Sequence, residues 1–284
     1  METRTDDLFD VSGKVIAATG GGGVLVGTLA RGLAARGARI AVLDIDEAAA
    51  QATVDAIGEA GGDAIAVHCD VLSRASVEAA RDVVVGRFGQ VDALINGAGG
   101  NRKGACVPPD GRFTDLALDE LDKVFALNYK GTFLPSQVFC RHFAERGEGV
   151  ILNTSSMSAL APLTNVPGYS NAKAAVTNFT QWLAVQVRVD FPGATIRVNE
   201  IAPGFLDTTQ NHHLLFEEDD KTLTKRGRSI IAHTPMGRFG DPDELVGPIV
   251  LLLSEAGSFV NGATLCIDGG FNAYSGVGPL DEKQ

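Results

Sequence analysis

The chain has 284 residues, 45% of them hydrophobic and 21% charged, which is the composition of a globular protein with room for one large domain or two small ones. Its formal net charge of −11 argues against nucleic acid or an anionic membrane surface as a partner. No run of the sequence approaches the roughly 18–20 apolar residues of a membrane-spanning helix.

The chain begins with a pattern that is typical of dinucleotide binding. Residues 13–20 are expected to form a short strand that ends in glycine, residues 24–37 a helix, and residues 38–44 a second strand that ends at Asp44. Glycines in such a turn let the backbone approach a pyrophosphate, and the N-terminus of the following helix favours its negative charge. Asp44 follows Gly20 by 24 residues, near the interval expected for a carboxylate that binds an adenosine ribose.

Strands and helices then alternate to the end of the chain. Further strands are expected at 63–70, 91–100, 149–156, 194–204 and 263–270, and helices at 46–62, 73–89, 113–147, 168–187 and 242–255. This alternation predicts an α/β protein in which residues 1–284 form a single Rossmann-type, doubly wound domain, with a seven-stranded parallel sheet and helices on both faces. Residues 205–240 are polar and follow a strand's C-terminal end, where such sheets bind ligands, so we expect a substrate lid there.

The expected helix at 168–187 carries a tyrosine and a lysine four residues apart. Tyr169 and Lys173 therefore leave the same face of the helix one turn apart. A free phenol titrates near about 10, and a neighbouring ammonium favours the phenolate, so we expect Lys173 to lower the pKa of Tyr169. Ser156, at the end of the preceding strand, would share a carbonyl or alcohol oxygen with the tyrosine.

The cysteines and the first residues favour a cytoplasmic protein. Cys69, Cys106, Cys140 and Cys266 show no CxxC spacing, which fits free thiols in a reducing compartment better than disulfides or zinc. The first ten residues are polar and acidic, unlike a signal peptide. The adjacent histidines at 212 and 213 lack a third ligand, so we expect no metal.

Seven motifs occur in the order found in the short-chain dehydrogenase/reductase family. They are TGGGG at 19–23, CDV at 69–71, NGAG at 96–99, NYKG around Asn128, TSS ending at Ser156, YSNAK at 169–173 and IAPG at 201–204. The chain resembles this family over nearly its whole length. The resemblance implies an NAD(P)-dependent oxidoreductase that transfers a hydride between nicotinamide and a secondary alcohol or ketone.

The resemblance also implies a catalytic set. The family's Asn, Ser, Tyr and Lys fall on Asn128, Ser156, Tyr169 and Lys173. Tyr169 would exchange the proton with the substrate oxygen, and Ser156 would hydrogen-bond that oxygen. Lys173 would depress the pKa of Tyr169 and bind the nicotinamide ribose, while Asn128 would hold a water that links Lys173 to solvent.

The cofactor site follows from the same resemblance. Its expected residues are Gly20, Gly22, Gly23, Leu25, Asp44, Asp70, Val71, Asn96, Ala98, Gly99, Tyr169, Lys173, Ile201, Pro203, Gly204 and Thr208. The family pattern TGxxxGxG has glycines where this chain has Val24 and Val26, so we expect an altered turn. Asp44 would accept both ribose hydroxyls of NAD and repel the 2′-phosphate of NADP, which favours NAD.

A narrower resemblance concerns the substrate. The segments TGGGGVL, INGAGGN, PLTNVPGYSNAKAAVTNFTQWLAVQ and IIAHTPMGRFGDP look like the branch of D-mannonate oxidoreductases, or fructuronate reductases, which interconvert a keto sugar acid and an aldonate. Such a substrate needs polar partners for its hydroxyls and a cation for its carboxylate. The candidate substrate residues are Asn101, Arg102, Lys103, Ser156, Gln210, Asn211 and Arg238.

Two other functions remain open, as does the assembly. The chain could reduce another carbonyl, such as a 3-oxoacyl thioester or a polyol-derived ketone, or it could be a sensor that binds NAD without turnover. The apolar segments 125–139 and 178–187, the second with Trp182, favour a subunit interface. Members of the family are commonly tetramers, so the resemblance implies a homo-oligomer, which we expect to be a homotetramer.

Overall fold

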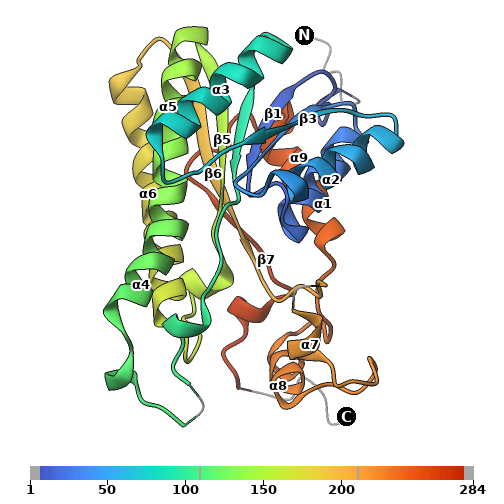
Figure 1. The fold of residues 1–284 in the computed structure, drawn as a ribbon, viewed down its shortest axis with the longest axis vertical. Helices are drawn as coiled ribbons and strands as arrows, with labels where there is room; N and C mark the ends of the chain where they lie inside the picture. The colour runs from blue at the N-terminus through green and yellow to red at the C-terminus, as the bar shows by residue number, and fades with distance from the viewer. Residues whose placement is uncertain (1–6, 109, 210, 278–284) are drawn as a thin grey trace.

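The centre of the protein is a parallel sheet of seven strands. The structure is a computed structural model that describes residues 7–108, 110–209 and 211–277. The strands run in the order β3-β2-β1-β4-β5-β6-β7 (Figure 1), which confirms the predicted doubly wound sheet. Their bounds are β1 Val15–Thr19, β2 Arg39–Asp44, β3 Asp63–His68, β4 Ala93–Asn96, β5 Glu148–Thr154, β6 Thr195–Pro203 and β7 Thr264–Ile267.

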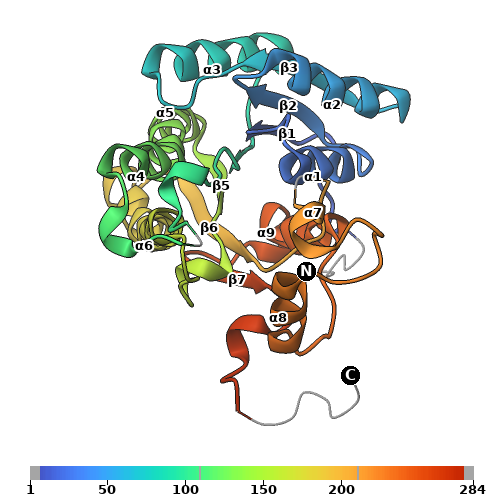
Figure 2. The same ribbon diagram turned by 60° about the horizontal axis from the view of Figure 1, so that its bottom comes forward.

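Helices cover both faces of this sheet. One face carries α1 (Val24–Ala34), α2 (Glu47–Glu59) and α9 (Val246–Leu253), and the other carries α3 (Arg74–Phe88), α5 (Gly131–Arg146) and α6 (Pro167–Asp190) (Figures 1 and 2). Along β1, Ile16 and Ala18 belong to the core beneath the first three helices, and Val15 and Ala17 to the core beneath the others. The central strand β1 is buried along its whole length and is mostly apolar because helices cover both of its faces.

Local sequence signals begin and end these helices. The Ser73 hydroxyl accepts a hydrogen bond from the Ser76 amide and so caps α3. The same helix ends at Gly89, whose φ of +84° is a left-handed conformation that glycine adopts without strain. Pro167 begins α6, where a missing N–H costs nothing.

The region predicted as one helix over 113–147 is divided in two. Helix α4 (Leu118–Phe125) is followed by a π-helical turn, Ala126–Lys130, before α5 begins. At this wider turn a side chain binds the Val124 carbonyl: the Asn128 Nδ2 donates a hydrogen bond to it at 2.8 Å. Short 3-10 turns occur at Lys103–Ala105, Phe113–Asp115, Met157–Ala159, Pro242–Leu245, Glu255–Gly257 and Phe271–Ala273.

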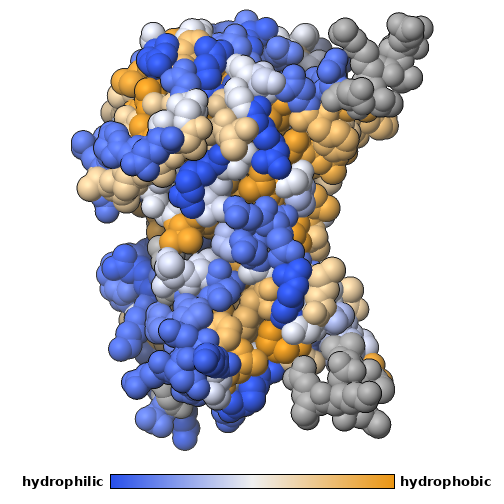
Figure 3. Space-filling model, turned by 90° about the vertical axis from the view of Figure 1, so that its right-hand side faces the viewer, coloured by the Kyte–Doolittle hydropathy of each residue, from blue (hydrophilic) through white to orange (hydrophobic). Residues whose placement is uncertain are grey.

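The segment 205–240 lies beyond the C-terminal ends of the strands. It contains α7 (His212–Leu215) and α8 (Lys225–His233), and Figure 2 turns this end toward the viewer. Backbone bridges pair Leu206 with Gly240 and Phe216 with Leu223. The molecule narrows between this part and the body that holds the sheet (Figure 3). Within the described residues, no helix combines the length and the apolar character that crossing a membrane requires.

Candidate active site

The glycine turn after β1 is held close to the loop that follows β4. Gly20 has a φ of +70°, and a Cβ there would lie 2.8 Å from the Ala98 backbone. The Thr19 hydroxyl accepts hydrogen bonds from the amides of Gly97 and Ala98. These two loops follow the neighbouring strands β1 and β4, where the chain order of the sheet reverses. Doubly wound sheets bind ligands at this point.

Asp44 connects the glycine turn to the end of β2. Its Oδ2 accepts the Gly22 amide at 2.9 Å, and its Oδ1 accepts the Asp46 amide at 3.0 Å. A Cβ on Gly22 would lie 2.7 Å from the Cβ of Ala49, so the turn also packs against α2. The carboxylate still has free lone pairs, and Asp44 lines a cavity.

The valines at 24 and 26 lie in the first turn of α1. Val24 is the first residue of α1, after the cap residue Gly23. Val26 is buried, and its Cγ2 lies 2.2 Å from the position that a Cβ on residue 97 would take. A side chain at 26 therefore fits because residue 97 is glycine, and α1 still begins at the cavity wall.

A cavity of about 600 Å³ opens at the C-terminal ends of the strands. Its wall includes fifteen of the predicted site residues: Gly20, Gly23, Leu25, Asp44, Asp70, Val71, Ala98, Gly99, Ser156, Tyr169, Lys173, Pro203, Gly204, Thr208 and Asn211. The wall also includes residues that the motifs did not single out, among them Ile45, Leu72, Leu127, Phe205 and Leu206. Ile45 and Leu72 directly follow predicted positions, so their place in the sequence was a usable signal.

Tyr169 and Lys173 lie together on this wall. The Lys173 Nζ lies 5.6 Å from the centre of the Tyr169 ring and donates a hydrogen bond to the Thr154 carbonyl at 2.7 Å. Lys173 is only 4% exposed, and burial lowers the pKa of its ammonium to about 8, against the opposing charge of Glu200. The lysine thus has a titration midpoint close to physiological pH.

The expectation that Lys173 lowers the pKa of Tyr169 is wrong for this structure. The pKa of Tyr169 is raised, because burial disfavours the phenolate more than a hydrogen bond with the Ser156 hydroxyl favours it. The Ser156 Oγ also accepts hydrogen bonds from the Ser158 amide and hydroxyl, each at 3.1 Å. Tyr169 is therefore a neutral phenol at physiological pH, which is a proton donor.

Asn128 is fully buried behind the cavity wall. Its Nδ2 donates to the Gly100 carbonyl at 2.7 Å, and its Oδ1 accepts the Gly100 amide at 3.1 Å. A Cβ on Gly99 would lie 2.7 Å from the Asn128 Oδ1 and 3.3 Å from the Lys173 Nζ. Glycine at position 99 therefore lets these two side chains lie beside the cavity.

Three more predicted cofactor residues lie behind the wall rather than on it. The Asn96 amide donates to Asn153 and Ser136 in the core, and Ile201 is fully buried. Gly22 is not part of the cavity wall, and its amide binds Asp44, which is. These residues support the loops from behind.

Most of the candidate substrate residues lie away from the cavity. Arg102 pairs with Glu120 at 3.4 Å, and Asn101 donates to the Cys106 sulfur, while Lys103 lies in the 3-10 turn that follows. Arg238 pairs with Glu244 at 2.6 Å and lines a second cavity of about 370 Å³. Asn211 lines the main cavity and accepts hydrogen bonds from the Thr208 amide and hydroxyl. Gln210 lies outside the described residues.

The first of the two adjacent histidines has partners. His212 lies 2.8 Å from Asp207 and 3.3 Å from Asp220, and it stacks on Phe216 with 4.5 Å between the ring centres. The pKa of His212 is raised, mainly by its hydrogen bond to Asp207. Desolvation lowers this pKa by a smaller amount, and the charges of Asp207 and Asp220 raise it further. Among the described residues, no cluster of three or more His, Cys, Asp or Glu side chains has a metal-binding arrangement.

Known proteins with similar sequences and folds are oxidoreductases. The profile of a family described as enoyl-(acyl carrier protein) reductase matches residues 27–272. An uncharacterised oxidoreductase of Bacillus subtilis, UxuB, is 46% identical over 94% of this chain and 98% of its own length. The 5-keto-D-gluconate 5-reductase of Escherichia coli is 33% identical over 93% of this chain and 98% of its own length.

A solved structure agrees with these sequence matches. A Haemophilus influenzae protein described as a candidate D-mannonate oxidoreductase, solved with bound NAD, superposes with a TM-score of 0.87. It is 43% identical, and the match covers 94% of this chain and 98% of that protein. The chain belongs to the short-chain dehydrogenase/reductase family and is an NAD(P)-dependent oxidoreductase.

Proposed function

We propose that this protein uses NAD to interconvert a keto sugar acid and the corresponding hydroxy acid, with D-fructuronate and D-mannonate as the first pair to test. The observation that carries the proposal is the convergence of Tyr169, Ser156 and Lys173 on the cavity that also contains Asp44 and the glycine turn. One end of this cavity can thus hold a nucleotide while the other supplies a proton donor. The similarity to a 5-keto-D-gluconate reductase and to a candidate D-mannonate oxidoreductase supports a sugar acid as the substrate.

The residues of the cavity fit a nicotinamide dinucleotide. Gly20 and Gly99 leave space where any side chain would collide with backbone or with Asn128, and the N-terminus of α1 points a positive dipole toward a pyrophosphate. Asp44 would accept the adenosine ribose hydroxyls, while its negative charge would oppose a 2′-phosphate, so we propose NAD rather than NADP. The similar Haemophilus influenzae protein was solved with NAD.

The bound nicotinamide supplies the hydride, and the chain supplies position and a proton. Because the pKa of Tyr169 is raised, its hydroxyl is protonated and can donate to a ketone oxygen during reduction. Ser156, which is hydrogen-bonded to that phenol, would hold the same oxygen. Lys173, with a pKa of about 8, would stabilise the phenolate that remains and help to return its proton. Asn128 would keep the loop at Gly100 in place beside the lysine.

The segment 205–240 is our proposed substrate lid. Thr208 and Asn211 already reach the cavity wall and could bind substrate hydroxyls. Among the described residues of that wall, Lys173 is the only cationic side chain, so a substrate carboxylate would find its further partner when the lid closes. Arg102 and Arg238 would have to leave Glu120 and Glu244 to take this role.

A subunit interface and a cytoplasmic location complete the proposal. Helix α6 exposes Trp182, Val185 and Val189, which is unusual for large apolar side chains on one helix face. We propose that this face pairs with another copy in a homotetramer, and sedimentation of a monomer at micromolar concentration would contradict that. All four cysteines are free thiols in the structure, and we propose a reducing, cytoplasmic location for them.

The test is a spectrophotometric assay of NADH and NADPH oxidation with fructuronate, 5-keto-gluconate, neutral ketoses and a 3-oxoacyl thioester. We expect fructuronate or another keto sugar acid to react fastest, with NADH preferred. The Tyr169→Phe variant should bind NADH normally but lose turnover by about 10²–10⁴-fold, the usual contribution of a positioned acid or base. Turnover of the thioester alone would move the protein to the acyl reductases. Binding of NADH without turnover of any carbonyl would favour the sensor.

A further inference from the structure

A row of polar side chains, three of them buried, crosses the sheet beneath the cavity. Asn96, Asn153, Glu200 and Thr264 are paired in register on the neighbouring strands β4, β5, β6 and β7. The Asn96 amide donates to Asn153, the Asn153 amide donates to Thr180 on α6, and the Thr180 hydroxyl lies 3.2 Å from Glu200. Polar side chains are rarely arranged this way in the centre of a parallel sheet, where apolar packing is usual.

Glu200 is the one ionisable member of this row. It is fully buried, and the Thr264 hydroxyl donates to its Oε1 at 2.8 Å. Hydrogen bonds from Thr177 and Thr180 on α6 also lower the pKa of its carboxyl, although burial raises it overall. A buried carboxyl with several hydroxyl partners remains ionisable, but a carboxylate so placed needs a nearby positive charge.

Lys173 is a buried positive charge on the same helix–sheet contact. Lys173 lies one turn before Thr177 on α6, and its Nζ donates to the Thr154 carbonyl on β5. Thr154 follows Asn153, and it pairs in register with Ile201, which follows Glu200. The two buried ionisable groups therefore sit on adjoining positions of one helix–sheet contact, and each charge acts on the other.

Few other ionisable groups face this pair. From α6 there is Tyr169, on the cavity side of Lys173, and from β7 there is Cys266, whose thiol pKa is raised by burial and by the charges of Asp268 and Glu200. The described neighbours on β4, β5 and α5 are amides and hydroxyls: Asn96, Ser136, Asn153, Thr154 and Ser155. Within the described chain, Glu200 is the only carboxylate that raises the pKa of Lys173.

We propose that Glu200 is a positioning residue whose buried negative charge keeps the Lys173 side chain an ammonium beside Tyr169. The inference rests on the proposed function for its catalytic consequence, but not for the interaction itself. Glu200 would act on Lys173, whose pKa its charge raises. It would thereby favour the state in which the lysine carries the charge and can stabilise a phenolate during proton transfer.

The sign of the effect can be worked out. Removing the Glu200 charge removes a stabilising partner of the ammonium, so Lys173 loses its proton at lower pH. At pH 7 a smaller fraction of the protein then carries the ammonium. The rate of reduction should fall as Lys173 loses its proton. The pH at which this rate is halved should therefore be lower in the variant than in the unmodified protein, and it should shift together with the titration midpoint of Lys173.

The experiment compares Glu200→Gln with the unmodified full-length protein. The variant keeps the shape and one acceptor oxygen but not the charge. Protein labelled with ¹³Cε-lysine is titrated by NMR without added nucleotide, and the Lys173 signal is assigned by its loss in Lys173→Met. We expect the Lys173 midpoint to fall by about one pH unit, the lower end of the range for close opposite charges. The pH profile of kcat/KM for reduction, at saturating NADH, should move in parallel.

Two further variants keep the result interpretable. Glu148→Gln removes an exposed carboxylate from the other end of β5 and should leave the Lys173 midpoint unchanged. Thr264→Val removes the hydroxyl that donates to Glu200, disfavours the carboxylate, and should give a smaller fall in the same direction, even if Glu200→Gln does not fold.

The outcomes separate this inference from the proposed function. An unchanged Lys173 midpoint in Glu200→Gln, or in Thr264→Val where Glu200→Gln does not fold, would overturn the inference and leave Glu200 a neutral packing residue. A shifted midpoint in a protein that reduces no carbonyl would support the inference while the proposed function fails. A reduced kcat at every pH, with no change in either midpoint, would mean a structural role and also overturn it.

Discussion

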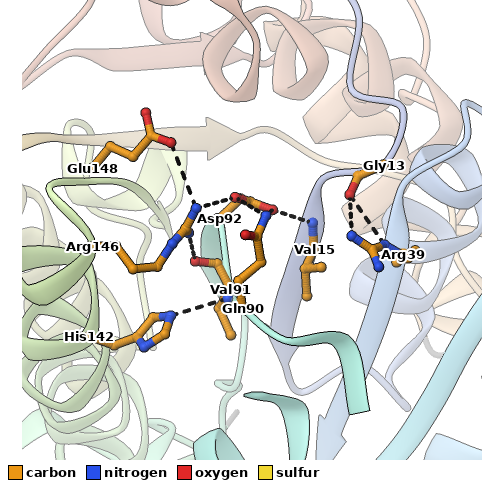
Figure 4. A network of polar contacts seen from close by, with 9 residues as sticks. All are labelled: Gly13, Val15, Arg39, Gln90, Val91, Asp92, His142, Arg146 and Glu148. Carbon is orange, nitrogen blue, oxygen red and sulfur yellow. Dashed lines mark hydrogen bonds and ion pairs between the residues drawn. The ribbon is translucent and has the colours of Figure 1, made fainter. Parts of the chain in front are cut away.

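The two ends of the parallel sheet are built in opposite ways. At the N-terminal ends of the strands, side chains bind one another and the backbone (Figure 4): Asp92 accepts the Val15 amide at 2.7 Å and pairs with Arg146 at 2.8 Å. His142 accepts the Val91 amide, and Arg146 also donates to the Val91 carbonyl. At the C-terminal ends, glycines keep the loops thin, and a cavity remains between them.

This difference suggests that one end of the sheet mainly stabilises the fold and the other mainly supports the reaction. The residues around Asp92 bind one another and the backbone, so their bonds stabilise the fold by joining β1, β4 and the end of α5. At the other end, Lys173 has a carbonyl as its direct partner and Tyr169 is kept as a phenol in a partly enclosed site. Substitutions at the N-terminal end should therefore change stability, and those at the C-terminal end should change turnover.

Of the substitutions that compare the two ends, Ser156→Ala at the C-terminal end should have the largest effect. Losing a hydroxyl that would bind the substrate oxygen should lower kcat/KM by about 10²–10³-fold. The free energy of unfolding should change by no more than about 1 kcal/mol, because Ser156 is only partly buried. Steady-state kinetics and urea unfolding measure the two effects separately.

Ser158→Ala is the matched control for that variant. Its hydroxyl donates to the Ser156 Oγ but does not lie on the cavity wall, so kcat/KM should fall by less than about tenfold. Equal losses in both serine variants would show that the hydroxyl pair, rather than Ser156 itself, determines turnover.

The second prediction concerns Asp92→Ala at the N-terminal end. It leaves the Val15 amide without its acceptor and the largely buried Arg146 guanidinium without its closest carboxylate, so the free energy of unfolding should fall by about 2–3 kcal/mol. Turnover per folded molecule should stay the same. Urea unfolding at pH 7 checks the first statement, and kinetics well below the unfolding midpoint check the second.

An exposed ion pair provides the comparison for Asp92. Asp63 pairs with Arg87 at 2.9 Å, with about half of each side chain exposed to solvent. Asp63→Ala should cost only about 0–1 kcal/mol. A large loss of turnover in fully folded Asp92→Ala would show that the N-terminal end also affects the reaction, which would contradict separate roles for the two ends.

The third prediction tests whether close packing at the C-terminal end also contributes to stability. Gly97→Ala would place a methyl group against Val26, so it should lower the free energy of unfolding by about 1–3 kcal/mol and weaken NADH binding. Adding Val26→Ala should recover much of both losses, with a coupling energy of about 1 kcal/mol. Additive losses, measured by urea unfolding and fluorescence titration of NADH, would mean that the two positions are independent.

The sequence predicted those features that depend on neighbouring residues. The alternation of strands and helices located the sheet, and a spacing of four residues placed Tyr169 and Lys173 on one helix face. The glycine turn and Asp44 were recognisable for the same reason, because strand, turn, helix and acid follow one another directly.

Features that join distant residues were beyond that reasoning. Asn128 in the π-helical turn binds the distant loop at Gly100, and Val26 fits only because position 97 is glycine. Arg102 and Arg238 looked available for a substrate until Glu120 and Glu244 were found beside them. The pKa of Tyr169 was expected to fall, since the sequence indicates its charged neighbour but not the burial that outweighs it.

The smallest expected effect distinguishes two kinds of ion pair. The pair of Asp92 with Arg146 joins a carboxylate to a guanidinium, a group that does not lose its proton in proteins, whereas His212 in the segment 205–240 is charged only below its pKa. The hydrogen bond to Asp207 raises that pKa above the usual value of about 6.5. The pairing therefore stabilises the segment fully below about pH 6.5 and is lost as the pH rises through the raised pKa. The protection of the α7 amides against hydrogen exchange, taken relative to the intrinsic exchange rate at each pH, should fall over this range in the unmodified protein and in His213→Gln, but not in His212→Gln. If the protection of α7 still depends on pH in His212→Gln, some other group controls the order of this segment. The contrast between the pH-dependent His212–Asp207 pair and the Arg146–Asp92 pair would then not hold.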